Sequence, residues 1–115
     1  YFLTSANAVT FGGELVNVDG TGNRVAGLAW GTSTVVVVAS VHKICRDTES
    51  ALQRVRDIAT PNNALRLGIE LPCTQVGYCL NCSHPSRSCR ATLVLERAPF
   101  GRTIHVILVG ETLGF

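Results

Sequence analysis

The sequence predicts an α/β layered domain with a mostly parallel, mixed sheet, on three observations. Four consecutive valines and an alanine, Val35 to Ala39, are typical of a strand covered on both faces, as in parallel sheets. A helical pattern over Asp47 to Ala59 follows that strand, and two apolar strand patterns, Thr92 to Glu96 and Thr103 to Val109, close the chain. Strands and helices in this order favour an α/β layered domain with right-handed crossovers.

Four elements are expected before the valine strand. Tyr1 to Leu3 is read as the end of a buried strand, followed by a short helical turn that runs through Val9. Glu14 to Asp19 alternates apolar and polar residues, which predicts a strand with one wet face. Arg24 to Trp30 has helical spacing and is closed by Gly31, so a short helix is expected there.

The second half begins with the clearest helix pattern of the chain. Over Asp47 to Ala59 the apolar residues fall on one face, and Asp47 or Thr48 can cap the first turn. Thr60 and Pro61 should stop that helix and open a second one that ends near Gly68. Residues 69–90 form a Cys-rich loop without periodicity, and a turn over residues 98–101 would join the last two strands as a hairpin.

Composition excludes several classes of protein. The 115 residues are 46% hydrophobic and 16% charged, which is enough apolar content to fill a core and excludes disorder. No apolar run approaches the ~18 residues that a spanning helix needs. The net charge of +2 comes from scattered arginines and forms no basic stripe. We therefore expect a cytoplasmic protein without a membrane or nucleic-acid partner, and an odd number of cysteines argues against a secreted disulfide framework.

Short polar residues and glycines concentrate between residues 4 and 27, and they predict a site for a small anionic ligand, carboxylate or phosphate. In α/β sheets ligands bind beyond the carboxyl ends of the strands, and the loops Thr4 to Asn7 and Ser40 to Lys43 lie there. A helix start beside an arginine also favours an anion. The candidate ligand-binding residues are Asn7, Asn17, Asp19, Gly22, Asn23, Arg24 and Lys43. The alternative is a polar hairpin whose side chains only satisfy turns.

Four cysteines form a second candidate site, with the spacing Cys73-x5-Cys79-x2-Cys82-x6-Cys89. Four thiolates in one loop can close a tetrahedral zinc site with Zn–S bonds of ~2.3 Å. The spacing is also near a plant-type ferredoxin run, so an iron–sulfur cluster is a second possibility. Reduced thiols or a Cys79–Cys82 redox pair are the remaining alternatives. Cys45 is interpreted as a small core residue.

Four runs carry a resemblance to a known family: YFLTSANAVT, GGELVNVDGTGNRVAG, VVVVASVHKI and VILVGETLGF. The chain resembles the LUD domain (DUF162) of lactate-utilisation proteins over nearly its whole length, most specifically in LVNVDGTGNRVA. The resemblance implies the fold of the ribose-phosphate isomerase, glucosamine-phosphate deaminase and CoA-transferase superfamily. It also implies that residues 1–115 are the C-terminal part of one domain of roughly two hundred residues, in agreement with a chain that starts at Tyr1.

The resemblance implies an accessory or ligand-binding role in the utilisation of lactate or a related hydroxy acid. Protein partners of a lactate oxidation system and a homo-oligomer are also expected. Two alternatives stay open: an enzyme of the sugar-phosphate isomerase or CoA-transferase type, and a metal-carrying interaction or electron-transfer protein.

One departure from the wider superfamily bears on catalysis. Methylthioribose-phosphate isomerase and the initiation-factor exchange subunits carry a GAD motif, and Ser5-Ala6-Asn7 stands in its place here. The Asn7 amide cannot act as a general acid or base, so isomerisation through this position is not expected. Nothing in the sequence ties Glu14 or Glu111 to the nucleophilic Glu of the CoA-transferases, and His42 is expected beside Lys43 at the cleft.

Overall fold

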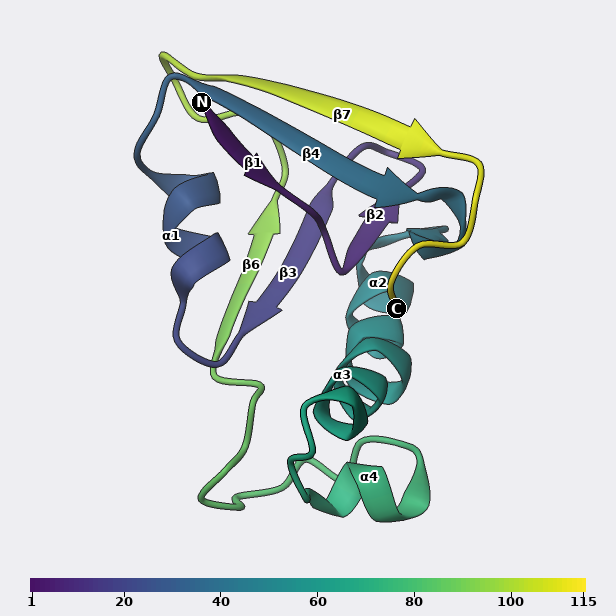
Figure 1. Ribbon diagram of the computed structural model, residues 1–115. Helices are drawn as coiled ribbons and strands as arrows, with labels where there is room; N and C mark the ends of the chain where they lie inside the picture. The colour runs from purple at the N-terminus through teal and green to yellow at the C-terminus, as the bar shows by residue number, and fades with distance from the viewer.

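Two β-sheets and a helical layer are stacked in the structure, a computed structural model that describes residues 1–115 (Figure 1). The first sheet, sheet A, has the strand order β1-β4-β7, and the second, sheet B, has the order β5-β2-β3-β6. The α/β layered class predicted from the sequence is confirmed. The strands are divided between a parallel sheet and a mixed one.

Sheet A is parallel throughout, with β4 (Thr34–Ser40) in its centre. It pairs with β1 (Phe2–Thr4) on one side and with β7 (Thr103–Val109) on the other. The valine run therefore forms the central parallel strand, as expected. The two faces of this strand are buried to different extents, because Val35 and Val37 are fully buried whereas Val36 and Val38 are half-buried. β1 is an edge strand with Leu3 71% exposed, so the expected buried N-terminal strand is wrong.

Sheet B contains β2 (Ala8–Thr10), β3 (Leu15–Asp19), β5 (Ile44–Cys45) and β6 (Ala91–Leu95). The helical turn expected through Val9 is wrong, because that segment is a strand paired with β3 and β5. The C-terminal hairpin is also wrong. β6 pairs with β3 in sheet B while β7 pairs with β4 in sheet A, so the two strands complete opposite walls of one core.

β3 is covered on both faces, which corrects the prediction of a wet face. Asn17 and Asp19 are 0% and 3% exposed, although their alternation with valines predicted that their side chains would be exposed to solvent. The reason is the layering, because sheet A packs on one side of sheet B and α2 (Thr48–Arg54) packs on the other. The alternation marks a face that contacts buried polar groups.

The helical layer begins as expected and then continues further. Asp47 caps α2 by accepting a 2.8 Å hydrogen bond from the Ser50 amide. The chain then passes through a π-helical segment (Val55–Ala59) directly into α3 (Thr60–Arg66). Pro61 does not stop the helix, because the wider π turn before it accommodates a ring in the first turn of α3. The Cys-rich loop contains one further helix, α4 (Pro72–Val76).

Three apolar clusters hold the layers together. The first lies between the two sheets and is closed at its end by Leu28 of α1 (Asn23–Ala29). The second joins sheet B to α2 through Val16 and Val55, and the third joins α3 to α4 around Leu71. No helix in the structure has both the length and the apolar character needed to cross a membrane.

Leu28 provides a test of the core. A Leu28→Ala variant should lose about 2–5 kcal/mol of unfolding free energy, because the side chain is fully buried between the sheets and leaves a cavity. Trp30→Ala, at the end of the same helix, should change stability by less than about 0.5 kcal/mol, because Trp30 is 85% exposed. Urea unfolding measures both, and equal losses would contradict the packing described here.

Candidate functional site

A cleft of about 610 Å³ opens beyond the carboxyl ends of β1 and β4. Figure 1 shows that these strand ends lie above the helical layer. One wall is α3, and the Cys-rich loop and the C-terminal residues complete the rim. The residues with polar side chains that line it are Ser5, Asn7, Asp19, Asn23, Arg24, Lys43, Thr60, Asn63, Arg66 and Ser88. The cleft therefore lies at the strand ends where the sequence predicted a ligand.

Five of the seven sequence-predicted ligand-binding residues line this cleft: Asn7, Asp19, Asn23, Arg24 and Lys43. They come from the turn after β1, the end of β3, the start of α1 and the 3-10 turn Val41–Lys43 after β4. Elements far apart in the chain are thus brought to one place, and ligand binding by these residues stays a prediction.

Arg24 joins three of these elements through side-chain hydrogen bonds. Its Nε donates to Asp19 Oδ1 at 2.7 Å, and its Nη2 donates to Asn7 Oδ1 at 3.1 Å and to the Val18 carbonyl at 2.8 Å. The second oxygen of Asp19 accepts the Val25 amide of α1 at 2.7 Å. The Asp19 side chain is almost fully buried and its carboxylate is fully used inside the protein. We call these residues, Asn7, Asp19 and Arg24, the arginine network.

Asn17 and Gly22 do not line the cleft. Asn17 is fully buried, and its Nδ2 donates to the Ser5 carbonyl at 3.1 Å, so it fixes the turn after β1 from behind. Its Oδ1 has no hydrogen-bond partner in the structure. Gly22 adopts φ +80 immediately before α1, a conformation that favours glycine, and its role is to start the helix.

Lys43 is the only lysine of the chain and is 8% exposed. Its Nζ lies 3.4 Å from Ser5 Oγ and 3.3 Å from the Ala6 carbonyl oxygen, and no carboxylate pairs with it. Burial lowers the pKa of Lys43, and the positive charges of Arg54 and Arg24 lower it further. His42, the preceding residue, is exposed and does not line the cleft.

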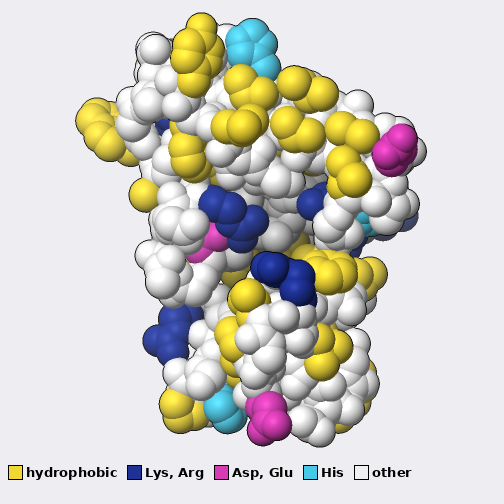
Figure 2. Space-filling model, viewed as in Figure 1, with side chains coloured by type: hydrophobic (Ala, Val, Ile, Leu, Met, Phe, Trp, Pro, Cys, Tyr) yellow, Lys and Arg dark blue, Asp and Glu magenta, His cyan; other side chains and the backbone are white.

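The cleft carries an excess of positive charge. Arg24, Lys43 and Arg66 line it, and the one side-chain carboxylate among its lining residues, that of Asp19, is already bonded to Arg24. Figure 2 shows Lys and Arg side chains gathered around the hollow that separates the upper and lower parts of this face. A buried lysine without a carboxylate partner favours an anion as the bound species.

The helical wall of the cleft was missed at the sequence level. Thr60, Asn63 and Arg66 lie on α3, which the sequence predicted only as a short second helix. A signal was present, because three polar residues at i, i+3 and i+6 share one face of a helix. Ser88 and the C-terminal Phe115 left no comparable signal, since their positions depend on the course of long loops.

The four clustered cysteines line a second, much smaller cavity, of about 20 Å³. Burial raises the pKa of the Cys73 thiol, and the neighbouring thiols, Cys89 first among them, raise it further. No group of three or more His, Cys, Asp or Glu side chains is arranged in the structure so that it could hold a metal ion. The thiols are therefore gathered but not in a coordinating arrangement, and metal binding stays a prediction.

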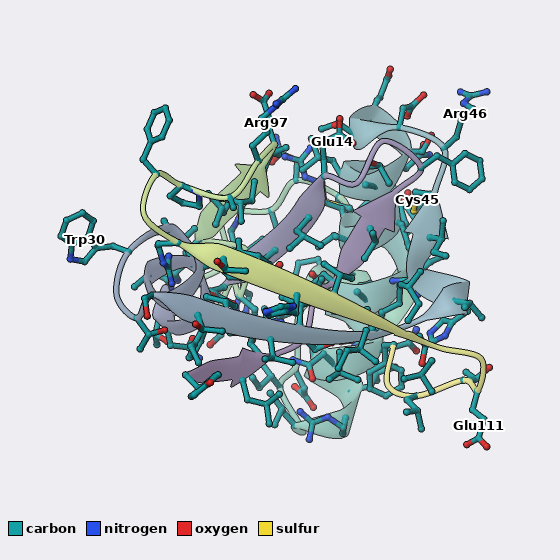
Figure 3. The ribbon with its side chains drawn as sticks, turned by 90° about the horizontal axis from the view of Figure 1, so that it is seen from above. Glu14, Trp30, Cys45, Arg46, Arg97 and Glu111 are labelled. Carbon is teal, nitrogen blue, oxygen red and sulfur yellow. The ribbon has the colours of Figure 1, made fainter.

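Other chemically active side chains lie away from both cavities. Figure 3 shows Glu14 and Glu111 at opposite edges of the molecule, and neither lines the cleft. Glu14 accepts a hydrogen bond from Thr10 Oγ1, which lowers the pKa of that carboxyl. Cys45 is half-buried on β5 and packs against the core between sheet B and α2, as a small core residue would.

The model of the LUD domain matches residues 1–109 of the chain. The chain belongs to the LUD domain family. Membership supports a protein related to lactate utilisation, and the match covers both the arginine network and the Cys-rich loop. No curated protein and no solved structure gives a significant match to this LUD domain chain. The likeness to the isomerase and CoA-transferase fold therefore stays a prediction.

The buried charge of Lys43 leads to a prediction about the stability of the fold. A Lys43→Met variant should be about 1 kcal/mol more stable near neutral pH, because an apolar side chain of similar length replaces a buried, unpaired charge. Since the pKa of Lys43 is lowered, the unfolded chain binds this proton more tightly than the folded one. Wild-type stability should thus rise with pH toward the ordinary lysine value of 10.5, and the difference between the two proteins should shrink.

Urea unfolding near neutral pH and at about pH 10 measures this difference. A Lys43→Met variant that is less stable at both values would show that the ammonium contributes a favourable interaction inside the fold.

Proposed function

We propose that this LUD domain binds a small anionic ligand, a carboxylate or a phosphate, and serves as an accessory ligand-binding component in lactate or hydroxy-acid utilisation. The observation that carries the proposal is the buried, unpaired ammonium of Lys43 at the base of a positively charged cleft. Burying such a charge is costly, and a bound anion would offset the cost.

The surrounding groups fit an anion whose carbon skeleton is short and polar. Ser5 and Lys43 offer an O–H and an N–H donor on the strand side, and Thr60 and Asn63 offer an O–H and an amide on the helix side. Arg66 reaches the rim, where its Nε and Nη2 both donate to Asn63 Oδ1. The cleft volume of about 610 Å³ is within the range of ~300–1,000 Å³ for small-molecule sites and exceeds the size of lactate itself.

The geometry favours binding over acid–base catalysis. Asn7 carries an amide, and the carboxylate of Asp19 is committed to Arg24 and the Val25 amide. No other side-chain carboxylate lines the cleft. An isomerase or a CoA-transferase needs a carboxylate at the reacting carbon, so these activities are less well supported than ligand binding. Protein partners and self-association stay predictions.

Calorimetric titration tests the proposal with inorganic phosphate, pyruvate, L-lactate and CoA, each added to the whole chain. At least one of them should bind, and its affinity should fall as salt is added. Lys43→Met should weaken that affinity about tenfold or more, because a charge-assisted hydrogen bond is lost. Arg46→Met is the matched control, since the Arg46 side chain is 80% exposed and outside the cleft.

Two outcomes would overturn the ligand-binding role: no heat and no shift in melting temperature with any of the four compounds, or an equal effect of both substitutions. Because Lys43→Met is expected to be more stable than the wild type, weaker binding by this variant could not be attributed to unfolding.

Substitution of Asn7 distinguishes ligand binding in the cleft from catalysis. Asn7→Asp keeps the acceptor for Arg24 and the Val18 amide but adds a negative charge to the cleft. It should therefore weaken anion binding by roughly fivefold or more, the effect of one partly buried like charge. Turnover of ribose phosphates by the wild type would instead favour the isomerase alternative.

A further inference from the structure

The cavity lined by four thiols lies between α3, α4 and the Cys-rich loop. We propose that it binds one structural zinc ion through Cys73, Cys79, Cys82 and Cys89, and that this ion fixes the outer wall of the cleft. The cavity volume of about 20 Å³ is close to that of a single water-sized species, which favours one ion over a cluster with bridging sulfides.

Apolar burial holds α4 through Leu71 but does not account for the position of residues 77–90, which follow it. Tyr78 and Leu80 are 53% and 49% exposed, whereas Cys79, Cys82 and Cys89 are half-buried. The large apolar side chains of this segment therefore do not attach it to the core. A loop of this length in a small domain needs another means of attachment, and its inward-facing thiols provide the ligands for one.

Backbone hydrogen bonds already fix the Cys79–Cys82 turn. Asn81 adopts φ +49, and its backbone N–H donates to Cys79 Sγ at 3.3 Å. The amide of Cys79 itself donates to Asp57 Oδ1 at 2.9 Å, which attaches the turn to the π-helical segment. A backbone N–H that donates to sulfur orients it as a metal ligand.

Charge around the cavity matches the proposed complex. Zinc binding by four thiols releases four protons and leaves a complex of net charge −2, since Zn²⁺ is held by four thiolates. Two guanidinium groups, Arg56 and Arg87, line the same cavity. Arg87 also donates to the carbonyls of Cys82 and Cys89, so one of the compensating charges is held against the loop.

Coordination requires the four sulfurs to move together. The thiols lie around a common cavity but are not arranged as a ligand set, so side-chain rotation must bring each sulfur to ~2.3 Å from the ion. Three of the four cysteines belong to a segment with few backbone hydrogen bonds, which permits this adjustment. Cys73 is at the start of α4 and supplies the fixed ligand.

The two cavities share a wall, which gives the ion its structural consequence. Thr60 and Ser88 line both cavities, and the Cys89 thiol donates to Thr60 Oγ1 with an S···O distance of 3.4 Å. An ion that holds Cys89 therefore also holds Ser88 beside α3. The zinc site completes the cleft without supplying an open coordination position for chemistry.

Metal analysis of the purified whole chain tests the proposal. Elemental analysis should find about one zinc per chain, and cobalt substitution should give the thiolate charge-transfer band of a tetrahedral site. Cys79→Ser and Cys82→Ser should each lose the bound zinc, while Cys45→Ser, which alters the one cysteine outside the cavity, should retain it. Thiol titration of the native wild type should find none of the four clustered cysteines reactive until a chelator is added.

Hydrogen exchange checks the structural role without any added anion, so its outcome is independent of ligand binding in the cleft. Removing zinc should lower protection in residues 57–63 and 77–90 and leave β4 and β7 unchanged. Folded protein with no metal and all five thiols free would overturn the proposal, as would disulfides among the four cysteines or a brown protein that contains iron and sulfide.

Discussion

The salt bridge between Arg24 and Asp19, with an N···O distance of 2.6 Å, is the interaction on which the candidate site depends. It ties the end of β3 to the start of α1, and through Asn7 it reaches the turn after β1. Because the Asp19 side chain is 1% exposed, this carboxylate has no access to water and must be satisfied inside the protein. Arg24 and the Val25 amide satisfy it.

That same pairing determines the charge of the cleft. With Asp19 committed to Arg24, no carboxylate is left to neutralise Lys43, and the buried ammonium faces only a hydroxyl and a carbonyl. The network thus positions the polar residues and at the same time leaves a positive potential in the cleft. Burial of the Lys43 charge lowers the stability of the fold. The proposed anion site would account for a buried charge that is kept at this cost.

The helical layer connects the cleft to the thiol cavity. The π-helical segment presents Asp57 to the Cys79 amide and leads directly into Thr60, which borders both cavities. π-helical segments are rare and are often found at functional sites. Here the wide turn lets one continuous helix carry a proline, pack on sheet B and form a wall for two cavities.

Sequence patterns predicted the local features of this fold well. The valine run became the central parallel strand, Asp47 became a helix cap, and the loops after β1 and β4 became the floor of the cleft. These features depend on neighbouring residues and on general rules for strand ends, which a single sequence contains. The gathering of the four cysteines near one another was likewise foreseeable from their spacing.

The tertiary structure decided which faces are buried and which strands pair. Asn17 and Asp19 alternate with valines as a wet strand would, yet sheet A and α2 cover both sides of β3. β6 and β7 follow each other like a hairpin, yet each finds its partner in a different sheet. Periodicity reports only that two faces differ, whereas burial and pairing depend on distant segments that compete to cover them. The sequence by itself determined which residues could form an anion site and a thiol site, and the packing of distant segments decided which of them meet.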